Sequence, residues 1–211
     1  MKILYIESKI KNANIVLRDE EIRKLPNKIF LLYTIQYKDS LKSIEKQLKK
    51  HKKTILGKKQ VLGCSRIKVT EPVLLVGNGR FHATNLLLQV NEIYILEYNT
   101  IIRVPYDSIN TLKMKLKTSL IKFLNANNIG IIVSSKPGQL NIQASLDIAN
   151  KLKEKLIKKD KNAGIFITNN INLDDLDNYH IDSWINLACP GLSYDDPRII
   201  NYITLKEEKL I

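Results

Sequence analysis

The segment KIFLLYTIQYKDSLKSIEKQL, residues 28–48, carries the pattern that decides the fold. Lys28 to Thr34 is an apolar run that ends in turn residues, which is typical of a strand buried on both faces of a parallel sheet. A helix with a cap at Asp39 or Ser40 follows. Its apolar residues lie on one face: Leu41, Ile44 and Leu48. A strand, a loop and an amphipathic helix in this order predict a parallel α/β unit.

Apolar runs of the same kind recur along the rest of the chain. They lie at Val73 to Gly77, Ile93 to Leu96, Ile129 to Ser134, Ala163 to Thr168 and Ser183 to Ala188. A second helical stripe repeats every fourth residue: Ala144, Ile148, Leu152 and Leu156. Strands that alternate with helices predict parallel sheets with right-handed crossovers. We therefore expect an α/β fold of two related parallel-sheet domains with helices on both faces, formed by residues 1–106 and 107–211.

The composition is that of a globular protein, with 44% hydrophobic and 26% charged residues among 211. No apolar run approaches the roughly 20 residues that span a bilayer, and the opening MKILYIESKIKNANI lacks the features of a signal peptide. We therefore expect a cytoplasmic protein without a membrane partner. Two cysteines, Cys64 and Cys189, are too few for a disulfide framework, and two buried thiols are their default interpretation.

The net charge of +13 makes an acidic partner such as RNA worth considering. However, much of the excess is Lys on predicted helical faces, as in KSIEKQLKKHKK (residues 42–53) and KLKEKLIKKDK (residues 151–161). The sequence contains no RGG tract, zinc-finger spacing or aromatic-studded basic strand. Solvated helix faces are therefore favoured over a nucleic-acid surface.

Ligands of open α/β sheets bind beyond the carboxyl ends of the strands, and unusual loops follow several predicted strands. These loops are residues 34–37, 77–82, 134–139 and 188–191, and a fifth unusual segment, residues 60–64, precedes the strand of Val73. In GNGRFH, the glycines could admit an anionic or zwitterionic ligand and Arg80 could bind a carboxylate, or the segment is a simple turn. By itself, His82 fits a hydrogen-bonded loop histidine better than a metal ligand.

The other loops have two interpretations each. SKPGQ is either a plain Pro-Gly turn or a loop that directs Lys136 and Gln139 into one crevice. Gln36 lies at a strand end, where it could bind a ligand or satisfy backbone groups. Both cysteines lie beside Gly or Pro, and thiolates suit iron-sulfur and zinc centres. Two cysteines cannot complete a structural zinc site, which needs four ligands. Trp184 and Phe166 are expected in the core.

Four motifs taken together carry a resemblance. VLGC, VGNGRFHATNL, SSKPGQ and WINLACP, in this order, resemble the diphthamide synthase family of archaeal type, also called 2-(3-amino-3-carboxypropyl)histidine synthase. The opening IESKIKNANIVLRDEEIRKLPNKI, followed by TIQY, is similar to the start of that family's second domain. The resemblance covers essentially the whole chain. It implies that residues 1–106 correspond to the family's second domain and residues 107–211 to its third.

The resemblance also implies a site. Members of that family have three related domains, each of which supplies one cysteine to a 4Fe-4S cluster that binds S-adenosylmethionine. Cys64 and Cys189 would be the second and third cluster ligands, whereas the first domain and its cysteine are absent from this sequence. No catalytic residue is assigned beyond the cluster. Residues assigned to the S-adenosylmethionine cavity are Gln36, Gly77, Gly79, Arg80, Phe81, His82, Lys136, Gly138 and Gln139.

The implied reaction is the radical transfer of the 3-amino-3-carboxypropyl group from S-adenosylmethionine to a histidine of translation elongation factor 2. Three segments depart from the family pattern: Gly191 replaces an Arg, Asn78 replaces an acidic residue, and residues 97–99 read EYN instead of DPY. Three functions therefore stay open. The chain is one half of a split enzyme that needs a separately encoded first-domain fragment, or an inactive scaffold or electron-delivery subunit beside a full-length homologue, or a basic nucleic-acid-binding module. The first two make it part of a homo- or hetero-oligomer.

Overall fold

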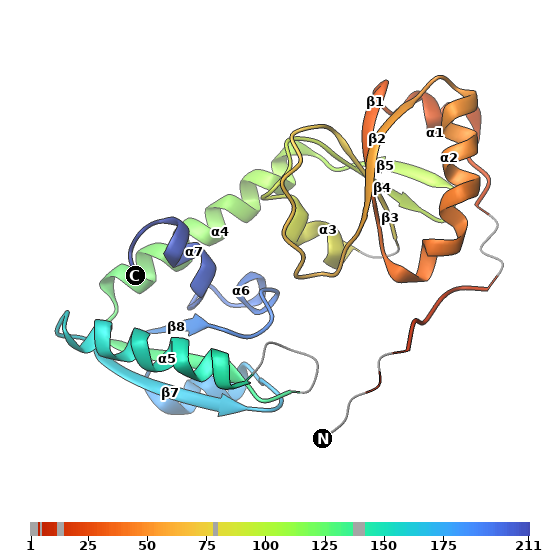
Figure 1. The fold of residues 1–211 in the computed structure, drawn as a ribbon. Coiled ribbons are helices and arrows are strands. Elements are labelled where there is room, and N and C mark those ends of the chain that lie inside the picture. Colours follow the sequence, from red (N-terminus) through yellow and green to blue (C-terminus); the bar gives the residue numbers. More distant parts are fainter. Residues whose placement is uncertain (1–3, 5, 12–14, 78–79, 137–141) are drawn as a thin grey trace. The chain divides into compact units, whose positions relative to one another are not determined.

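The chain forms two compact units, Leu4–Asn110 and Thr111–Ile211 (Figure 1). The computed structural model describes residues 4, 6–11, 15–77, 80–136 and 142–211. For residues 80–82 only the backbone is described. Helix α4, Tyr106–Asn125, begins in the first unit and continues into the second.

The first unit is built on a five-stranded sheet with the order β2-β1-β3-β4-β5. Neighbouring strands are parallel except for β5, which is antiparallel to β4. The strands are β1 Lys28–Tyr33, β2 Thr54–Gln60, β3 Val73–Val76, β4 Ile93–Glu97 and β5 Thr100–Arg103. The antiparallel β5 corrects the expectation of a purely parallel sheet. It follows a two-residue hairpin turn in which Tyr98 has a φ of 55°.

Strand β2 was not among the predicted apolar runs. It lies at the edge of the sheet, where its residues alternate between half-buried and exposed along most of its length, and it contains Lys58 and Lys59. Charged residues on an edge strand discourage pairing with another chain. They also remove the continuous apolar run that a buried strand shows, which explains why the sequence pattern missed it.

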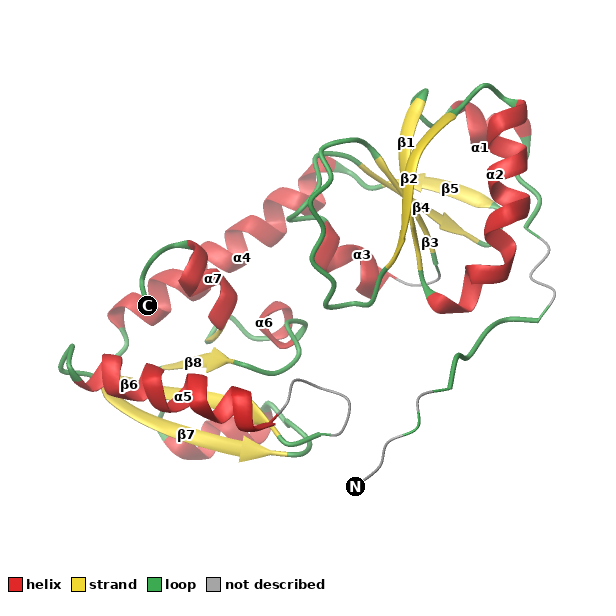
Figure 2. Ribbon diagram, viewed as in Figure 1, coloured by secondary structure: helices red, strands yellow, loops and turns green. Residues whose placement is uncertain are grey.

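Helices cover both faces of this sheet. Figures 1 and 2 show α1 and α2 on one face and α3 on the other. The helices are α1 Asp19–Arg23, the 3-10 helix η1 Ile35–Ser40, α2 Leu41–Lys50 and α3 Arg80–Leu86. The predicted stripe of α2 is confirmed, because Leu41, Ile44 and Leu48 pack in one core cluster with Ile29 and Leu31 of β1. Ser40 makes no capping hydrogen bond, since η1 runs directly into α2.

Glu21 joins α1 to the sheet as a buried carboxylate with a side chain 4% exposed. It accepts a hydrogen bond from Lys24 Nζ at 2.7 Å and one from the backbone amide of Ile101 in β5 at 2.6 Å. These two hydrogen bonds, that from Lys24 first, hold the pKa of Glu21 below its ordinary value. The charged form is therefore the one that stabilises the fold.

We expect Glu21→Gln to lower the free energy of unfolding by about 1.5–3 kcal/mol, the range for hydrogen bonds to a charged group. Because the folded pKa is the lower one, the stabilisation is complete above the ordinary value of 4.5 and is lost as the pH falls through the folded pKa. Urea denaturation followed by circular dichroism between pH 7 and pH 3 measures both effects. Glu20→Gln is the control, since Glu20 has a side chain 65% exposed. Equal pH slopes for the two variants would contradict the prediction.

The second unit contains a four-stranded sheet with the order β7-β6-β8-β9, in which all neighbours are parallel. The strands are β6 Asn128–Ser134, β7 Asn162–Thr168, β8 Ser183–Asn186 and β9 Ile199–Asn201. The other elements are α5 Ile142–Ile157, the 3-10 helix η2 Asp174–Tyr179, α6 Leu192–Asp195 and α7 Tyr202–Glu207. Strand β9 was not predicted, because its three residues are too few to form a recognisable run.

Helices cover both faces of this sheet as well. One core cluster joins Ile131 of β6 to Leu152 of α5 and Leu205 of α7. A second joins Trp184 of β8 to Leu176 of η2. Trp184 is fully buried, which confirms it as a core residue, whereas Phe166 packs against this core but is only half-buried. The expected α/β class with helices on both faces is thus confirmed.

The two units share a topology. In each, the first strand along the chain lies between the second and the third, as β2-β1-β3 and as β7-β6-β8. Lys53 and Lys161 immediately precede the equivalent edge strands, and each donates a hydrogen bond to a backbone carbonyl, of Leu25 and Ala126 respectively. This common arrangement supports the interpretation of the units as structural repeats.

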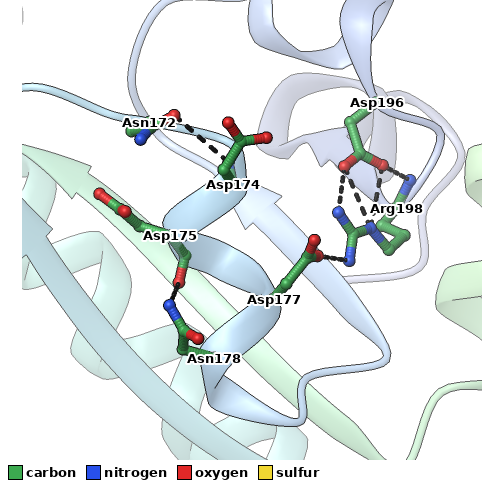
Figure 3. A network of polar contacts seen from close by, with 7 residues as sticks. All are labelled: Asn172, Asp174, Asp175, Asp177, Asn178, Asp196 and Arg198. Carbon is green, nitrogen blue, oxygen red and sulfur yellow. Dashed lines mark hydrogen bonds and ion pairs between the residues drawn. The ribbon is translucent and has the colours of Figure 1, made fainter.

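A network of charged residues fixes the connection before β9 (Figure 3). Arg198 donates hydrogen bonds from Nε and Nη2 to Asp196 Oδ2 at 3.0 and 2.6 Å, and its Nη1 contacts Asp177 of η2. Partial burial acts to raise the pKa of Asp196, but the hydrogen bonds from Arg198 outweigh it and hold that pKa below its ordinary value. The network therefore holds η2 against the amino end of β9.

Candidate functional site

Three of the predicted site positions lie beyond neighbouring strand ends in the first unit. Gln36 follows β1, Cys64 follows β2 and Gly77 follows β3. These strands are adjacent and parallel, so their carboxyl ends meet at one edge of the sheet. The structure therefore places Gln36, Cys64 and Gly77 at the edge where α/β sheets bind ligands.

Cys64 lies in a turn that side chains hold in place. The Leu62 amide donates a hydrogen bond to Ser65 Oγ at 2.7 Å, and the Ser65 amide donates one back to the Leu62 carbonyl at 3.0 Å. The Ser65 carbonyl in turn accepts hydrogen bonds at 3.1 Å from Asn85 Nδ2 and Gln89 Nε2. Cys64 itself is a free, exposed thiol, so the default interpretation of a buried thiol is wrong for this residue.

Gly77 is required by the close approach of two strand ends. The Thr34 amide donates to the Val76 carbonyl at 3.1 Å, so the backbone after β1 lies against the end of β3. A Cβ atom on Gly77 would lie 2.9 Å from Thr34 Cγ2. Gln36, two residues further on, has an exposed side chain, and its carbonyl accepts a hydrogen bond from the Ile10 amide at 3.0 Å.

We expect Gly77→Ala to lower the free energy of unfolding by about 1–2 kcal/mol, in the range for overpacking a tight contact. The added methyl group displaces Thr34 and with it the start of η1. Thr34→Ser removes Cγ2, so the double variant should recover part of the loss. Thermal unfolding followed by circular dichroism measures the difference. If Gly77→Ala lowers the free energy of unfolding equally with Thr and with Ser at position 34, the contact with Thr34 Cγ2 is not the cause of the destabilisation.

The second unit also has two predicted site residues beyond neighbouring strand ends. Lys136 follows β6 and Cys189 follows β8, and these strands are parallel partners in which Ile132 pairs with Asn186. Lys136 is exposed, and its backbone amide donates to Ser134 Oγ at 3.2 Å. The carboxyl edge of this sheet therefore presents a cation and a thiol.

Cys189 is a free thiol on a half-buried loop that a side chain fixes on both sides. Asn186 Oδ1 accepts a hydrogen bond from the Ala188 amide at 2.8 Å, and Asn186 Nδ2 donates one to the Cys189 carbonyl at 2.8 Å. Sequence reasoning missed the role of Asn186. The available signal was an amide residue at the end of an apolar run, inside the WINLACP motif.

Other predicted residues are placed only in part. Gly79, Gly138 and Gln139 lie outside the described residues. Arg80, Phe81 and His82 form the start of α3, so His82 belongs to a helix and not to a loop as expected. In the topology of the units, Cys64 follows the second strand along the chain, whereas Cys189 follows the third. The two cysteines thus do not occupy equivalent positions in the repeats.

Cys64 and Cys189 fit the chemistry of an iron-sulfur cluster, because both are unpaired thiols on preorganised loops and thiolates are the preferred ligands of such clusters. Within the described ranges, no group of three or more His, Cys, Asp or Glu side chains could hold a metal ion. The sequence has no third cysteine. For the part of the chain that the structure covers, no helix is long and apolar enough to cross a membrane.

The sequence profile of the diphthamide synthesis protein family matches residues 1–199. The chain therefore belongs to this family, and the resemblance carried by its motifs is confirmed. It is 28% identical over 189 residues to 2-(3-amino-3-carboxypropyl)histidine synthase of Pyrococcus horikoshii. This alignment covers 83% of this chain and 54% of that protein. It is also 28% identical over 199 residues to subunit 1 of the Dictyostelium discoideum enzyme, covering 82% of this chain and 40% of that subunit.

The chain thus spans about half the length of these curated relatives. Among solved structures, it is similar to the crystal structure of Dph2 from Pyrococcus horikoshii, with a TM-score of 0.69 and 23% identity over 86% of this chain and 57% of that one. A crystal structure of the same protein with a 4Fe-4S cluster gives the same values. This likeness shows that the fold is shared.

Proposed function

We propose that this chain is a component of the enzyme that transfers the 3-amino-3-carboxypropyl group of S-adenosylmethionine to a histidine of translation elongation factor 2. This is the first step of diphthamide biosynthesis, which we place in the cytoplasm. One observation carries the proposal. This chain belongs to the family and has free thiols at Cys64 and Cys189, and each thiol lies beyond a strand end on a loop that side-chain hydrogen bonds hold in place.

In this proposal Cys64 and Cys189 each bind one iron of a 4Fe-4S cluster, like the cluster named for the Pyrococcus horikoshii structure. When bound, the cluster supplies the electron that breaks the bond between the sulfonium and the aminocarboxypropyl carbon, which releases methylthioadenosine and a 3-amino-3-carboxypropyl radical. In this proposal the radical adds to C2 of the imidazole, the electron that the adduct must lose to restore the ring would return to the oxidised cluster, and the C2 proton would leave to solvent.

The other site residues bind and orient the substrate in this proposal. Lys136 is an exposed cation beyond β6, next to the strand that leads to Cys189, and it suits the carboxylate of S-adenosylmethionine. Because Gly77 has no side chain, the substrate can approach the backbone at the end of β3 closely. We propose the same cavity for Gln36, Gly79, Arg80, Phe81, His82, Gly138 and Gln139.

The proposal needs a third cluster cysteine, since these 211 residues contain two. We propose that the two units correspond to the second and third domains of the family. The third cysteine then comes from the portion of the relatives that this sequence does not match, carried by a separately encoded fragment or by a full-length homologue. Activity in this proposal requires both parts.

A second candidate is a non-catalytic subunit that supports an active homologue by scaffolding or electron delivery. The observation in its favour is Gly191, which stands where the family usually has Arg and which here precedes α6 directly after the Cys189-Pro190 pair. Without the guanidinium, the loop lacks a fixed cation that could hold a carboxylate. A pairing of this chain with a full-length homologue would be the expected assembly.

Anaerobic reconstitution with iron and sulfide tests the proposal. The chain is reconstituted alone and together with the missing portion of the family, and iron content and electron paramagnetic resonance of the reduced sample are measured. We expect a cubane-type signal and cleavage of S-adenosylmethionine to methylthioadenosine when both parts are present. A cluster without cleavage would favour the supporting subunit. No cluster, together with RNA affinity that falls steeply with salt, would favour the nucleic-acid-binding module instead.

A further inference from the structure

Two asparagines are buried at matching positions where β8 and β9 end. Asn186 is the last residue of β8 and Asn201 the last of β9, and the two pair in the sheet register. Their exposed fractions are 3% and 7%. Buried amides are retained where their hydrogen bonds are made, so the partners show what these side chains hold.

The partners lie in the loop that carries Cys189. Asn186 accepts from the Ala188 amide and donates to the Cys189 carbonyl, both at 2.8 Å, and it also donates to Asn201 Oδ1 at 2.8 Å. Asn201 Nδ2 donates to the Pro190 carbonyl at 3.2 Å and to Ser193 Oγ at 2.7 Å. Ser193 Oγ donates to the same Pro190 carbonyl at 3.0 Å. The buried network is thus continuous from the sheet to the cysteine.

These contacts fix the peptide groups on both sides of Cys189. The amide of Ala188 restrains the chain before the cysteine, and the carbonyls of Cys189 and Pro190 restrain it afterwards. With both sides held, the direction of the Cα–Cβ bond of Cys189 is also held. A ligand held in this way reaches its iron without the entropy loss of ordering the loop on binding.

We infer that Asn186 and Asn201 are positioning residues that present the Cys189 thiolate to the cluster. This inference rests on the proposed function, since it presumes that Cys189 is a cluster ligand. Ser193 supports the arrangement through the Pro190 carbonyl. None of the three side chains bonds the thiol itself; they act through the backbone of its loop.

Three variants of the full chain test the inference: Asn186→Leu, Asn201→Leu and Ser193→Ala. The first two keep the shape of the side chain but remove its hydrogen bonds. Ser193→Ala removes only a hydroxyl group, so it should fold even if the other two do not. The control is Ser183→Ala. Ser183 is fully buried in the same strand, and its Oγ donates to the Arg198 carbonyl at 3.1 Å at the opposite end of β8. It loses a buried hydrogen bond without touching the Cys189 loop.

The first measurement is amide hydrogen exchange in the metal-free chain. We expect the Ala188 amide to exchange about tenfold faster in Asn186→Leu and at the rate of the unchanged chain in Ser183→Ala. The second measurement is made on protein reconstituted with iron and sulfide. It records the rate at which a chelator removes the cluster and the line shape of the electron paramagnetic resonance signal after reduction. We expect about tenfold faster loss in the asparagine variants, as for residues that orient metal ligands.

Each outcome is informative. Unchanged exchange and unchanged cluster loss in the asparagine and Ser193 variants, with a cluster present in the unchanged chain, would overturn the inference and leave the proposed function standing. Equal changes in Ser183→Ala would also overturn it, because the effect would then be general destabilisation. If the unchanged chain takes up no cluster even together with the missing portion of the family, the proposed function fails and the positioning role fails with it, whatever the exchange rates show.

Discussion

Replacing either Cys64 or Cys189 by serine is expected to abolish the iron-sulfur signal of the reconstituted protein. Serine keeps the size of the side chain but replaces a soft thiolate with a hydroxyl that stays protonated near neutral pH, and iron-sulfur clusters are held by thiolates. Loss of an orienting contact alone lowers metal affinity by about 10–100-fold, so loss of a ligand should exceed about 100-fold. Iron content, sulfide content and electron paramagnetic resonance measure the loss.

The structure indicates that these substitutions leave the fold intact. Cys64 is exposed and Cys189 is only half-buried, and neither belongs to a core cluster of the described residues. Unchanged thermal unfolding of the metal-free variants is therefore the control. A cluster signal that survives in one variant would remove that cysteine from the ligand set. Survival in both would contradict the proposed function.

Most of the strands that the sequence pattern predicted are buried on both faces, although the edge strand β7, whose residues are half-buried or exposed, was predicted as well. Leu74 and Leu75 of β3, or Ile131 and Ile132 of β6, are consecutive and almost fully buried, and only a central parallel strand buries both sides of its backbone. Edge strands carry a weaker signal. Lys58 and Lys59 of β2 face solvent, and β5 has one buried residue, Ile101. Their assignment depends on which neighbour they pair with, and local sequence does not contain that information.

The same limit explains which part of the candidate site the sequence could predict. Cys64 and Cys189 were assigned because their motifs resemble those of a family. Asn186 belongs to one of those motifs, yet its role depends on Asn201, fifteen residues later in the chain. That pairing requires the parallel register of β8 and β9, and β9 was too short to be predicted. Contacts that depend on tertiary register follow from the structure and not from local pattern.

Gly130→Ala is expected to destabilise the second unit by about 3 kcal/mol, at the upper end of the range for overpacking a core. Gly130 lies in the centre of β6 and pairs with Trp184 of β8. A Cβ atom on Gly130 would lie 2.2 Å from Trp184 Cε3 and Cζ3. The indole is fully buried and packs edge-on against Phe166, with ring centroids 4.8 Å apart, so it has no free direction in which to move.

The chain contains a matched control and a direct test of the mechanism. Gly164 pairs with Gly130 across β6 and β7, but its Cβ would meet only the half-buried ring of Phe166, at 3.1 Å, so Gly164→Ala should cost less than about 1 kcal/mol. Because Trp184 is the single tryptophan, its fluorescence during urea denaturation reports on this unit. Trp184→Leu removes the clash, so its combination with Gly130→Ala, followed by circular dichroism, should show a coupling of about 2 kcal/mol. Additive losses in that double variant would mean that the indole is not what excludes a side chain at position 130.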